Sequence, residues 1–272
     1  MGVRVAKRQR LDLSVVERGL AETRSRAQAL ILAGDVLVNG QRQLRAADLV
    51  ALSDDIALRA KPRFVSRGGE KLAHALDRFE VPVAGVVAVD LGASTGGFTD
   101  CLLQGGAQRV YAVDVGYGQI DERVRSDPRV AVMERTNARY LDDLPEPVDL
   151  AVADLSFISL SLIFPVIARL LKPDGRCIPL IKPQFEAGRG DIGKGGVVRD
   201  PVIHRRVLHT ALRAAAGHGL MAQGLTASPL RGPAGNVEFL ALLMHGGEPG
   251  DLDALVERAM AEATGERDQT KS

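Results

Sequence analysis

The sequence predicts an α/β fold: a seven-stranded, mostly parallel sheet with helices on both faces, preceded by a small α+β unit. From residue 86 onward, short apolar runs rich in β-branched residues alternate with stretches of helical spacing. Such alternation is typical of a parallel sheet covered on both faces. Before residue 60 the strand-like runs at 36–38 and 56–58 are short, and Asn39-Gly40 is a strong hairpin signal. A chain of 272 residues is long enough for both parts.

The composition is that of an ordinary globular protein, with 46% hydrophobic and 25% charged residues. These values exclude disordered, collagen-like and coiled-coil chains. Pro62 favours an extended backbone at Lys61, within a short basic stretch, so we place a linker there. The expected organisation is a small domain, a basic linker, a large domain and a polar tail, at residues 1–59, 60–65, 66–262 and 263–272.

Two helices and a small sheet are expected in the N-terminal domain. The helices are indicated by apolar residues at helical spacing, by a possible cap at Ser25 and by Gly34 as a stop signal. Leu13, Val16 and Leu20 follow helical spacing in the first helix, and the expected buried side of the second helix holds Ala29, Leu30 and Leu32. Short strands are expected at 36–38 and 56–58.

The large domain should hold the parallel sheet. Its expected strands are 86–90, 109–113, 130–134, 148–153, 176–181, 220–226 and 237–244. Its expected helices are 97–104, 119–125, 160–171 and 202–216, with a further helix around Lys71 leading into the domain.

Several classes of protein are excluded by the cysteines, histidines and apolar runs. Cys101 and Cys177 form no C-x-x-C motif, and the five histidines show no ligand spacing, so we expect no metal site. Both thiols are expected to be buried and free, which fits a reducing cytoplasm. The longest uncharged apolar-rich run has 14 residues, too short for a bilayer, and the charged N-terminus does not resemble a signal peptide. A soluble cytoplasmic protein without a membrane partner is therefore expected.

The net charge of +1 hides a gradient along the chain. Residues 1–71 carry 14 Lys and Arg against 8 Asp and Glu, whereas the remaining residues carry 21 against 26. A basic arm on an acidic body suggests binding to a polyanion, with phosphate neutralisation as the use of the cations.

A glycine-rich loop follows the first strand of the large domain, with the sequence DLGASTGGFT at 90–99. At the carboxyl end of a parallel strand, such a loop is the usual ligand site, and Asp114 after the next strand can accept hydrogen bonds from a ribose. Ser94 breaks the G-x-G-x-x-G dinucleotide pattern at its second glycine. Asp90 would repel a pyrophosphate but suits a cationic ligand, which favours S-adenosylmethionine over NAD.

A second glycine-rich stretch, GRGDIGKG at 188–195, nearly spells a phosphate-binding P-loop. Gly195 stands where the magnesium-binding Ser or Thr is required, and no helical pattern follows directly. We interpret it as a mobile loop over the site and do not expect ATP binding.

Motifs along nearly the whole chain then point to one family. They are DLGASTGGFT, DVGYGQ, RTNAR, DLSFIS, IKPQFE and GNVE, at 90–99, 114–119, 135–139, 154–159, 181–186 and 235–238. The large domain with these motifs resembles the TlyA (hemolysin A) family of S-adenosylmethionine-dependent 2′-O-ribose rRNA methyltransferases. The N-terminal domain resembles the S4 RNA-binding domain. The resemblance implies a Rossmann-like class I methyltransferase fold of the FtsJ type.

The resemblance implies a catalytic tetrad of Lys71, Asp154, Lys182 and Glu238. A ribose 2′-hydroxyl must lose its proton as it attacks the methyl group, and a neutral lysine amine can take that proton. A neighbouring lysine and desolvation are expected to lower the lysine pKa from its ordinary value of about 10.4, while the carboxylates temper that shift. Lys182 is the expected base, Lys71 positions the hydroxyl, and the carboxylates orient the lysines.

The other expected sites follow from position and resemblance. The expected cofactor-binding residues are Asp90, Gly92, Ser94, Gly96, Gly97, Asp114, Thr136 and Asn137, with Tyr117 a candidate for stacking. The expected RNA-binding residues are Arg4, Lys7, Arg8, Arg10, Arg18, Arg24, Arg26, Arg42, Lys61, Arg63 and Arg67. The family implies a cytidine in 16S or 23S rRNA, within ribosomal subunits, as the target of a monomeric enzyme.

Three alternatives stay open from the sequence. A nicotinamide dehydrogenase would share the alternating pattern. A catalytically silent RNA-binding or ribosome-assembly protein would keep the basic arm. A cytolysin is suggested by the family's hemolysin name.

Overall fold

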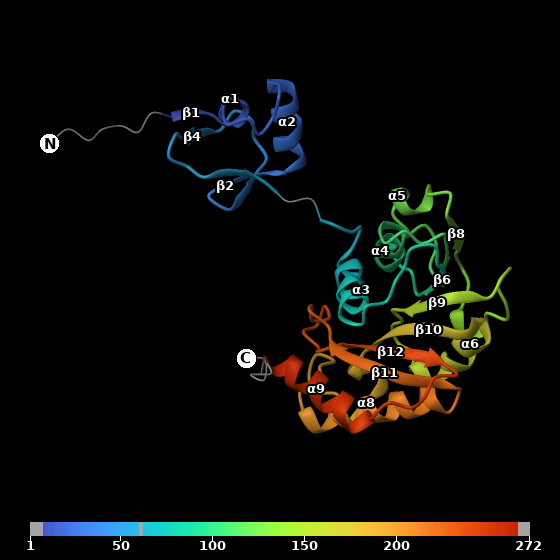
Figure 1. Cartoon of the computed structure of the whole chain (residues 1–272). Coiled ribbons are helices and arrows are strands. Elements are labelled where there is room, and N and C mark those ends of the chain that lie inside the picture. Colours follow the sequence, from blue (N-terminus) through green and yellow to red (C-terminus); the bar gives the residue numbers. More distant parts are fainter. Residues whose placement is uncertain (1–7, 60–61, 266–272) are drawn as a thin grey trace. The chain divides into compact units, whose positions relative to one another are not determined.

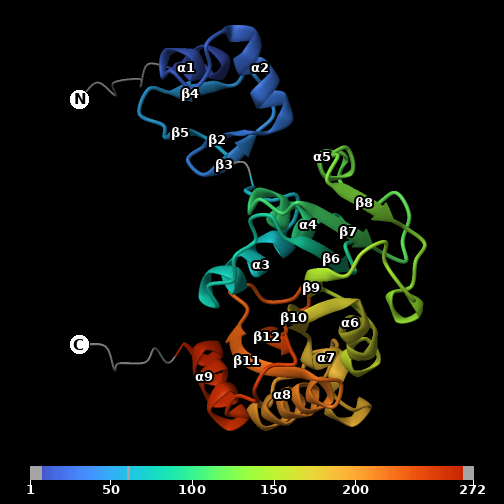
Figure 2. The ribbon, with the colours of Figure 1, turned by 45° about the vertical axis from the view of Figure 1, so that its right-hand side comes forward.

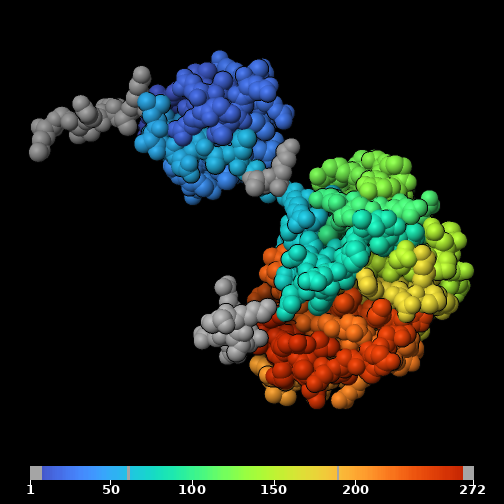
Figure 3. All heavy atoms as spheres, in the orientation of Figure 1, coloured from blue at the N-terminus to red at the C-terminus, as the bar shows by residue number. Residues whose placement is uncertain are grey.

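The computed structural model describes residues 8–59 and 62–265 (Figure 1). It divides into two compact units, residues 1–62 and 63–272, each of which is described by itself. In the space-filling view of Figure 3, the described atoms of each unit are closely packed.

The first unit is a small α+β domain around its own apolar core. Its elements are β1 (Arg8–Arg10), α1 (Leu11–Glu17), α2 (Arg24–Ala33), β2 (Val36–Val38), β3 (Gln41–Gln43), β4 (Leu49–Ala51) and β5 (Ile56–Leu58). The central strand β2 pairs antiparallel with both β3 and β5, and β1 pairs with β4. Asn39 and Gly40 join β2 to β3 with φ values of 51° and 77°, which confirms the predicted hairpin turn.

The predicted buried face of the second helix is wrong. The cap is Thr23, whose hydroxyl accepts a hydrogen bond from the Arg26 N–H, and not Ser25. The helix buries Ala27 and Ile31, whereas Leu32 is 76% exposed. Residues four apart share a helix face, so Ala27 and Ile31 form the stripe that packs on α1. Ala29 is exposed, whereas Leu30 is partly buried against the same core.

The second unit contains the predicted seven-stranded sheet (Figure 2). Its strands are β6 (Val87–Leu91), β7 (Arg109–Val113), β8 (Val130–Met133), β9 (Val148–Ala153), β10 (Leu171–Ile181), β11 (Leu220–Ala227) and β12 (Phe239–His245). The order across the sheet is β11-β12-β10-β9-β6-β7-β8. Strand β12 runs in the opposite direction to the other six strands of this sheet, which confirms a mostly parallel sheet.

Helices cover both faces of this sheet. They are α3 (Arg67–Arg78), α4 (Gly97–Gln104), α5 (Glu122–Arg125), α6 (Phe164–Leu170), α7 (Pro183–Glu186), α8 (Pro201–Ala216) and α9 (Leu252–Thr264). The predicted helix 119–125 is reduced to α5 because Asp121 caps a later start. The predicted helix 160–171 divides into a 3-10 turn and α6. Helix α9, capped by Asp251, was missed, although its leucine and valine spacing is helical.

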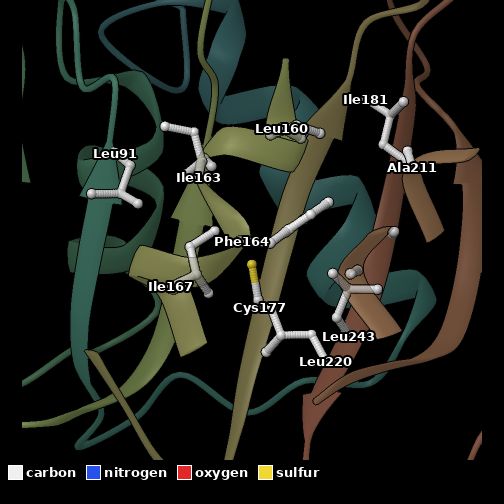
Figure 4. Packing of buried hydrophobic residues seen from close by; sticks show 14 of the residues in the cluster. Leu91, Leu160, Ile163, Phe164, Ile167, Cys177, Ile181, Ala211, Leu220 and Leu243 are labelled. Atoms are coloured by element: carbon white, nitrogen blue, oxygen red, sulfur yellow. The ribbon is translucent and has the colours of Figure 1, made fainter. Parts of the chain in front are cut away.

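Two apolar clusters sandwich the sheet, because successive residues of a strand point to opposite faces. Along β10, Cys177 packs with α6, α8 and α9, whereas Ile178 packs with α3 and α4. Figure 4 shows Cys177 among Phe164 and Ile167 of α6 and Leu220 and Leu243 of β11 and β12. Both cysteines are buried and free, as predicted.

Candidate active site

Four charged residues meet at one edge of the sheet. Asp154 follows β9 and Lys182 follows β10, and these strands are parallel neighbours. Glu238 precedes β12, which runs antiparallel beside β10, so its amino end lies at the same edge. Lys71 is contributed by helix α3 and reaches Glu238. Residues far apart in the sequence are thus brought together by the strand order.

The four residues form two ion pairs. Lys71 Nζ lies 2.5 Å from Glu238 Oε2, and Lys182 Nζ lies 2.6 Å from Asp154 Oδ1. The side chains of Lys71 and Lys182 are only 9% and 10% exposed. Charged groups are rarely buried to this degree unless they are paired, so each lysine has a dedicated counter-charge.

Further contacts fix each pair in place. Lys182 Nζ also donates to Ser156 Oγ at 3.1 Å and lies 5.7 Å from the centre of the Phe185 ring. Glu238 is 1% exposed, and a Cβ at Gly232 would lie only 2.5 Å from its Oε1. Gly232 is therefore required by the close approach of the carboxylate.

The glycine-rich loop after β6 lies directly against this edge. Gly92 has a φ of 88°, and a Cβ there would lie 2.6 Å from the Asp154 carbonyl oxygen, so only glycine fits. Ser94 also has a positive φ, 49°, and its N–H donates to Asp114 Oδ2 at 2.7 Å. The loop thereby contacts both Asp114, at the end of β7, and Asp154, the partner of Lys182.

A cavity of about 680 Å³ opens between these segments. Its lining includes five of the expected cofactor residues together with Asp154, namely Gly92, Ser94, Asp114, Thr136 and Asn137. A smaller cavity of about 90 Å³ adjoins it and is lined by Ser66, Gly68, Gly97 and part of the same loop. Ser66 and Gly68 were not singled out from the sequence, although Ser66 before two glycines is a helix-cap signal.

The remaining expected cofactor residues are placed differently. Asp90 does not line the larger cavity: it is fully buried, and its Oδ2 accepts hydrogen bonds from the N–H and hydroxyl of Thr99 at 3.0 and 2.7 Å. Its Oδ1 has no partner among the described residues, and burial raises the pKa of Asp90 to about 7. Gly96 faces Val124. The cofactor roles of all eight expected residues stay predictions.

Gly97 is needed for helix packing. A Cβ on Gly97 would lie 2.1 Å from Ser66 Oγ and 3.0 Å from the Gly69 nitrogen. The start of α3 can therefore approach the start of α4 only because residue 97 has no side chain.

Exposed aromatic rings lie near the larger cavity. Phe157, in its lining, is 89% exposed with a φ of 64°, and its ring centre lies 4.9 Å from that of Phe185. A bulky residue with a left-handed backbone conformation and an exposed side chain is uncommon. Apart from its place in the DLSF motif, no pattern in the sequence indicates this conformation. Tyr117 is 69% exposed and lies under the Arg135 guanidinium.

The expected RNA-binding cations of the N-terminal unit have different environments. Arg10 and Arg24 both bind the buried Asp12 at 2.9 Å. Arg18 donates to the carbonyls of Leu52 and Asp54, and Arg42 to that of Ala33. Arg8 and Arg26 are exposed and form no ion pair within residues 8–59 and 62–265. Arg4, Lys7 and Lys61 lie outside the described residues.

Two further expected cations belong to the second unit. Arg63 stacks over the Phe64 ring at 4.6 Å. Arg67 donates to the Arg231 carbonyl at 2.6 Å, one helical turn before Lys71. Among the described residues there is no cluster of three potential metal ligands and no helix long and apolar enough to cross a membrane.

Comparisons with known proteins identify the family of both units. The FtsJ-like methyltransferase family matches residues 64–244, and the S4 domain matches residues 9–56. A Mycobacterium tuberculosis protein named "16S/23S rRNA (cytidine-2'-O)-methyltransferase TlyA" is 47% identical over 245 residues, 88% of this chain and 91% of that protein. A Bacillus subtilis protein named "Putative rRNA methyltransferase YqxC" is 45% identical over 269 residues, 97% of this chain and 96% of that protein.

A solved structure extends the match to the fold. The structure titled "Putative hemolysin from Streptococcus thermophilus" has a TM-score of 0.74 and 41% identity, and covers 96% of this chain and 98% of that one. The chain belongs to the TlyA (hemolysin A) family of FtsJ-like methyltransferases, with an S4 domain before the methyltransferase domain.

Proposed function

We propose that the protein transfers a methyl group from S-adenosylmethionine to the ribose 2′-hydroxyl of a cytidine in 16S or 23S rRNA. The observation that carries this proposal is the pair of buried lysine–carboxylate contacts beside the cavity at Gly92. The name of the M. tuberculosis relative, which states this reaction, supports the choice of substrate.

The cavity beside Gly92 fits the proposed cofactor. Its volume, about 680 Å³, is in the usual range for small-molecule sites. The Asp114 carboxylate is fixed by the N–H groups of Ser94 and Gly116 and keeps lone pairs for the hydroxyls of a ribose. Thr136 and Asn137 line the same cavity and are the candidate adenine contacts. Two carboxylates in the lining, Asp114 and Asp154, suit a cationic sulfonium ligand.

The tetrad then performs the proton transfer. S-adenosylmethionine supplies an electrophilic methyl group on a positively charged sulfur. Lys182 acts as a base only as the neutral amine, after its ammonium form has released one proton to water. As the ribose oxygen bonds to that carbon and the sulfur–carbon bond breaks, the neutral Lys182 Nζ takes the hydroxyl proton. The positive charge moves from sulfur to Lys182, so the net charge of the site stays constant. Lys71 donates to the ribose oxygen and holds it in line, while Asp154 and Glu238 keep both amines in place.

Transfer of a tritiated methyl group tests the substrate. Purified protein is incubated with labelled S-adenosylmethionine and with intact ribosomal subunits, bare 16S and 23S rRNA, duplex DNA or a protein mixture. We expect label in rRNA, either within subunits or free. Label confined to DNA or protein would contradict the proposal.

A further inference from the structure

The catalytic site leaves one sequence motif unused, the near-P-loop at 188–195. In the structure, residues 193–197 form a short hairpin, hereafter the glycine hairpin. Gly193 and Val197 pair antiparallel, with the Gly193 N–H donating to the Val197 carbonyl at 3.1 Å. Lys194, Gly195 and Gly196 form its exposed tip. The prediction of a loop without a following helix is correct, since α8 begins only at Pro201.

A buried side chain holds the glycine hairpin. Asn236 is 1% exposed; its Oδ1 accepts from the Val198 N–H and its Nδ2 donates to the Gly196 carbonyl, both at 3.0 Å. Because the buried Asn236 side chain bonds both the Val198 N–H and the Gly196 carbonyl, it fixes one conformation of an otherwise exposed turn. Asn236 lies two residues before Glu238, so the hairpin is tied to the segment that carries a catalytic carboxylate.

Three exposed cations surround the hairpin. Lys194 is at its tip, and a Cβ on Gly193 would lie 3.4 Å from Arg199 Nη1. Arg231 donates to the carbonyl of Gly235, next to Asn236. Within the described part of the chain, none of the three cations forms an ion pair.

The nearby carboxylates are occupied elsewhere. Asp191 pairs with Arg206. Asp200 accepts from the Val202 N–H at the start of α8. The positive charge of the three cations is therefore left for a partner.

The backbone at the tip is open to such a partner. The N–H groups of Lys194 and Gly195 donate no hydrogen bond to any described residue. A Cβ at Gly195 or Gly196 would meet nothing within 4 Å, so open space surrounds both. An anion's oxygen atoms can thus reach the N–H groups and the Lys194 ammonium together.

We propose that the glycine hairpin is a binding site for the phosphate backbone of the RNA substrate, located in the methyltransferase domain beside the Lys71–Glu238 pair. This inference rests on the proposed function. Exposed, unpaired cations and free N–H groups are the groups that contact phosphate oxygens in nucleic-acid complexes. A contact of this kind positions the strand for the tetrad and does not read its sequence.

The test compares Lys194→Ala with control variants that remove the same charge elsewhere. The controls are Arg213→Ala and Arg258→Ala, on α8 and α9, which are exposed and unpaired within the described residues. We expect Lys194→Ala to raise the KM for rRNA roughly tenfold and to lower the slope of log affinity against log salt by about 1. The kcat and the affinity for S-adenosylmethionine should stay unchanged. An rRNA KM and a salt slope equal to those of the controls would overturn the inference.

A second variant tests the buried amide. Asn236→Asp keeps the size of the side chain but loses the donor to the Gly196 carbonyl. We expect weaker rRNA binding with unchanged affinity for S-adenosylmethionine, which also reports that the domain is folded. Unchanged rRNA binding in both Lys194→Ala and Asn236→Asp would exclude the hairpin as a site. If the wild type fails to methylate rRNA, the proposed function fails, while the salt dependence of rRNA binding still tests the hairpin.

Discussion

Two cation–carboxylate clusters in this chain differ in which partner is buried. In the N-terminal unit only the carboxylate is buried: Asp12 is 0% exposed, while the side chains of Arg10 and Arg24 are 39% and 52% exposed. Gln28 adds another hydrogen bond to Asp12. This cluster fastens β1, α1 and α2 together.

At the sheet edge both members of each pair are mostly buried. Lys71 and Glu238 are 9% and 1% exposed, and Lys182 and Asp154 are 10% and 23% exposed. Both lysines therefore have little contact with water. The buried carboxylate of the N-terminal unit thus holds elements together, whereas the buried lysines of the second unit carry the chemistry that we propose.

The largest effect should follow loss of the buried cation at the sheet edge. Lys182→Ala is expected to lower kcat about 10²–10⁴-fold, the usual contribution of a general base, with unchanged affinity for S-adenosylmethionine. Steady-state methyl transfer and calorimetry measure the two quantities.

Lys172 offers the matched control for that substitution. It lies near the other end of β10 and pairs with Asp149 at 2.7 Å, but it is 43% exposed. Lys172→Ala should keep nearly full activity. Equal losses in the two variants would mean that the Lys182 effect is structural.

Loss of the buried carboxylate should act on stability instead. Asp12→Asn is expected to cost about 2 kcal/mol in the free energy of unfolding of the N-terminal unit, since hydrogen bonds to a charged group are lost. Hydrogen exchange of α1 and α2 amides measures this, with the exposed Asp55→Asn as the control. An unchanged exchange rate in Asp12→Asn would contradict the structural role.

The two units should also respond to pH in opposite directions. The Arg10 guanidinium holds the pKa of Asp12 well below 3.8, so its stabilisation is present at neutral pH and is lost as the pH falls below about 4. Burial raises the pKa of Asp90 from 3.8 to about 7, so the stability of the second unit should fall as the pH rises between these values. Asp90→Asn should remove that fall. If the stability of the wild-type second unit did not change between pH 3.8 and about 7, the predicted effect of Asp90 would be refuted.

The smallest effect concerns two arginines on one helix. Arg24 binds Asp12, whereas the exposed Arg26 forms no ion pair within the described residues. Arg26→Ala should lower the salt slope of rRNA binding by about 1 with no change in stability, and Arg24→Ala should destabilise the N-terminal unit. Binding titrations at several salt concentrations, together with hydrogen exchange, separate the two outcomes. Loss of stability in Arg26→Ala and a lower salt slope without loss of stability in Arg24→Ala would contradict these roles.

The strands of the sheet were predicted more accurately from the sequence than the burial of helix and loop side chains. Strands 109–113 and 148–153 agree with β7 and β9 to the residue because apolar β-branched runs end there at clear turn or charge signals. Leu32 was wrongly predicted to be buried. Periodicity shows that a helix has an apolar face, but the face that is buried depends on the element against which α2 packs. Phe157 was missed because its positive φ depends on the packing of the loop after β9.

The site was predictable only in part for the same reason. Asp154 and Lys182 could be placed from their positions at strand ends. The contact between Lys71 and Glu238 joins residues 167 positions apart and depends on β12 entering the sheet antiparallel. The enclosure of Asp90 by Thr99 likewise needs the helix packed onto β6.

In the proposed mechanism, the two lysine–carboxylate pairs deprotonate and align a ribose hydroxyl. Mass spectrometry of nucleosides from rRNA methylated by the wild-type protein tests it most directly. We predict 2′-O-methylcytidine as the product, formed at least about 100-fold more slowly by Lys182→Ala under the same conditions. A methyl group on a base, or the same product formed at the wild-type rate by Lys182→Ala, would contradict this mechanism.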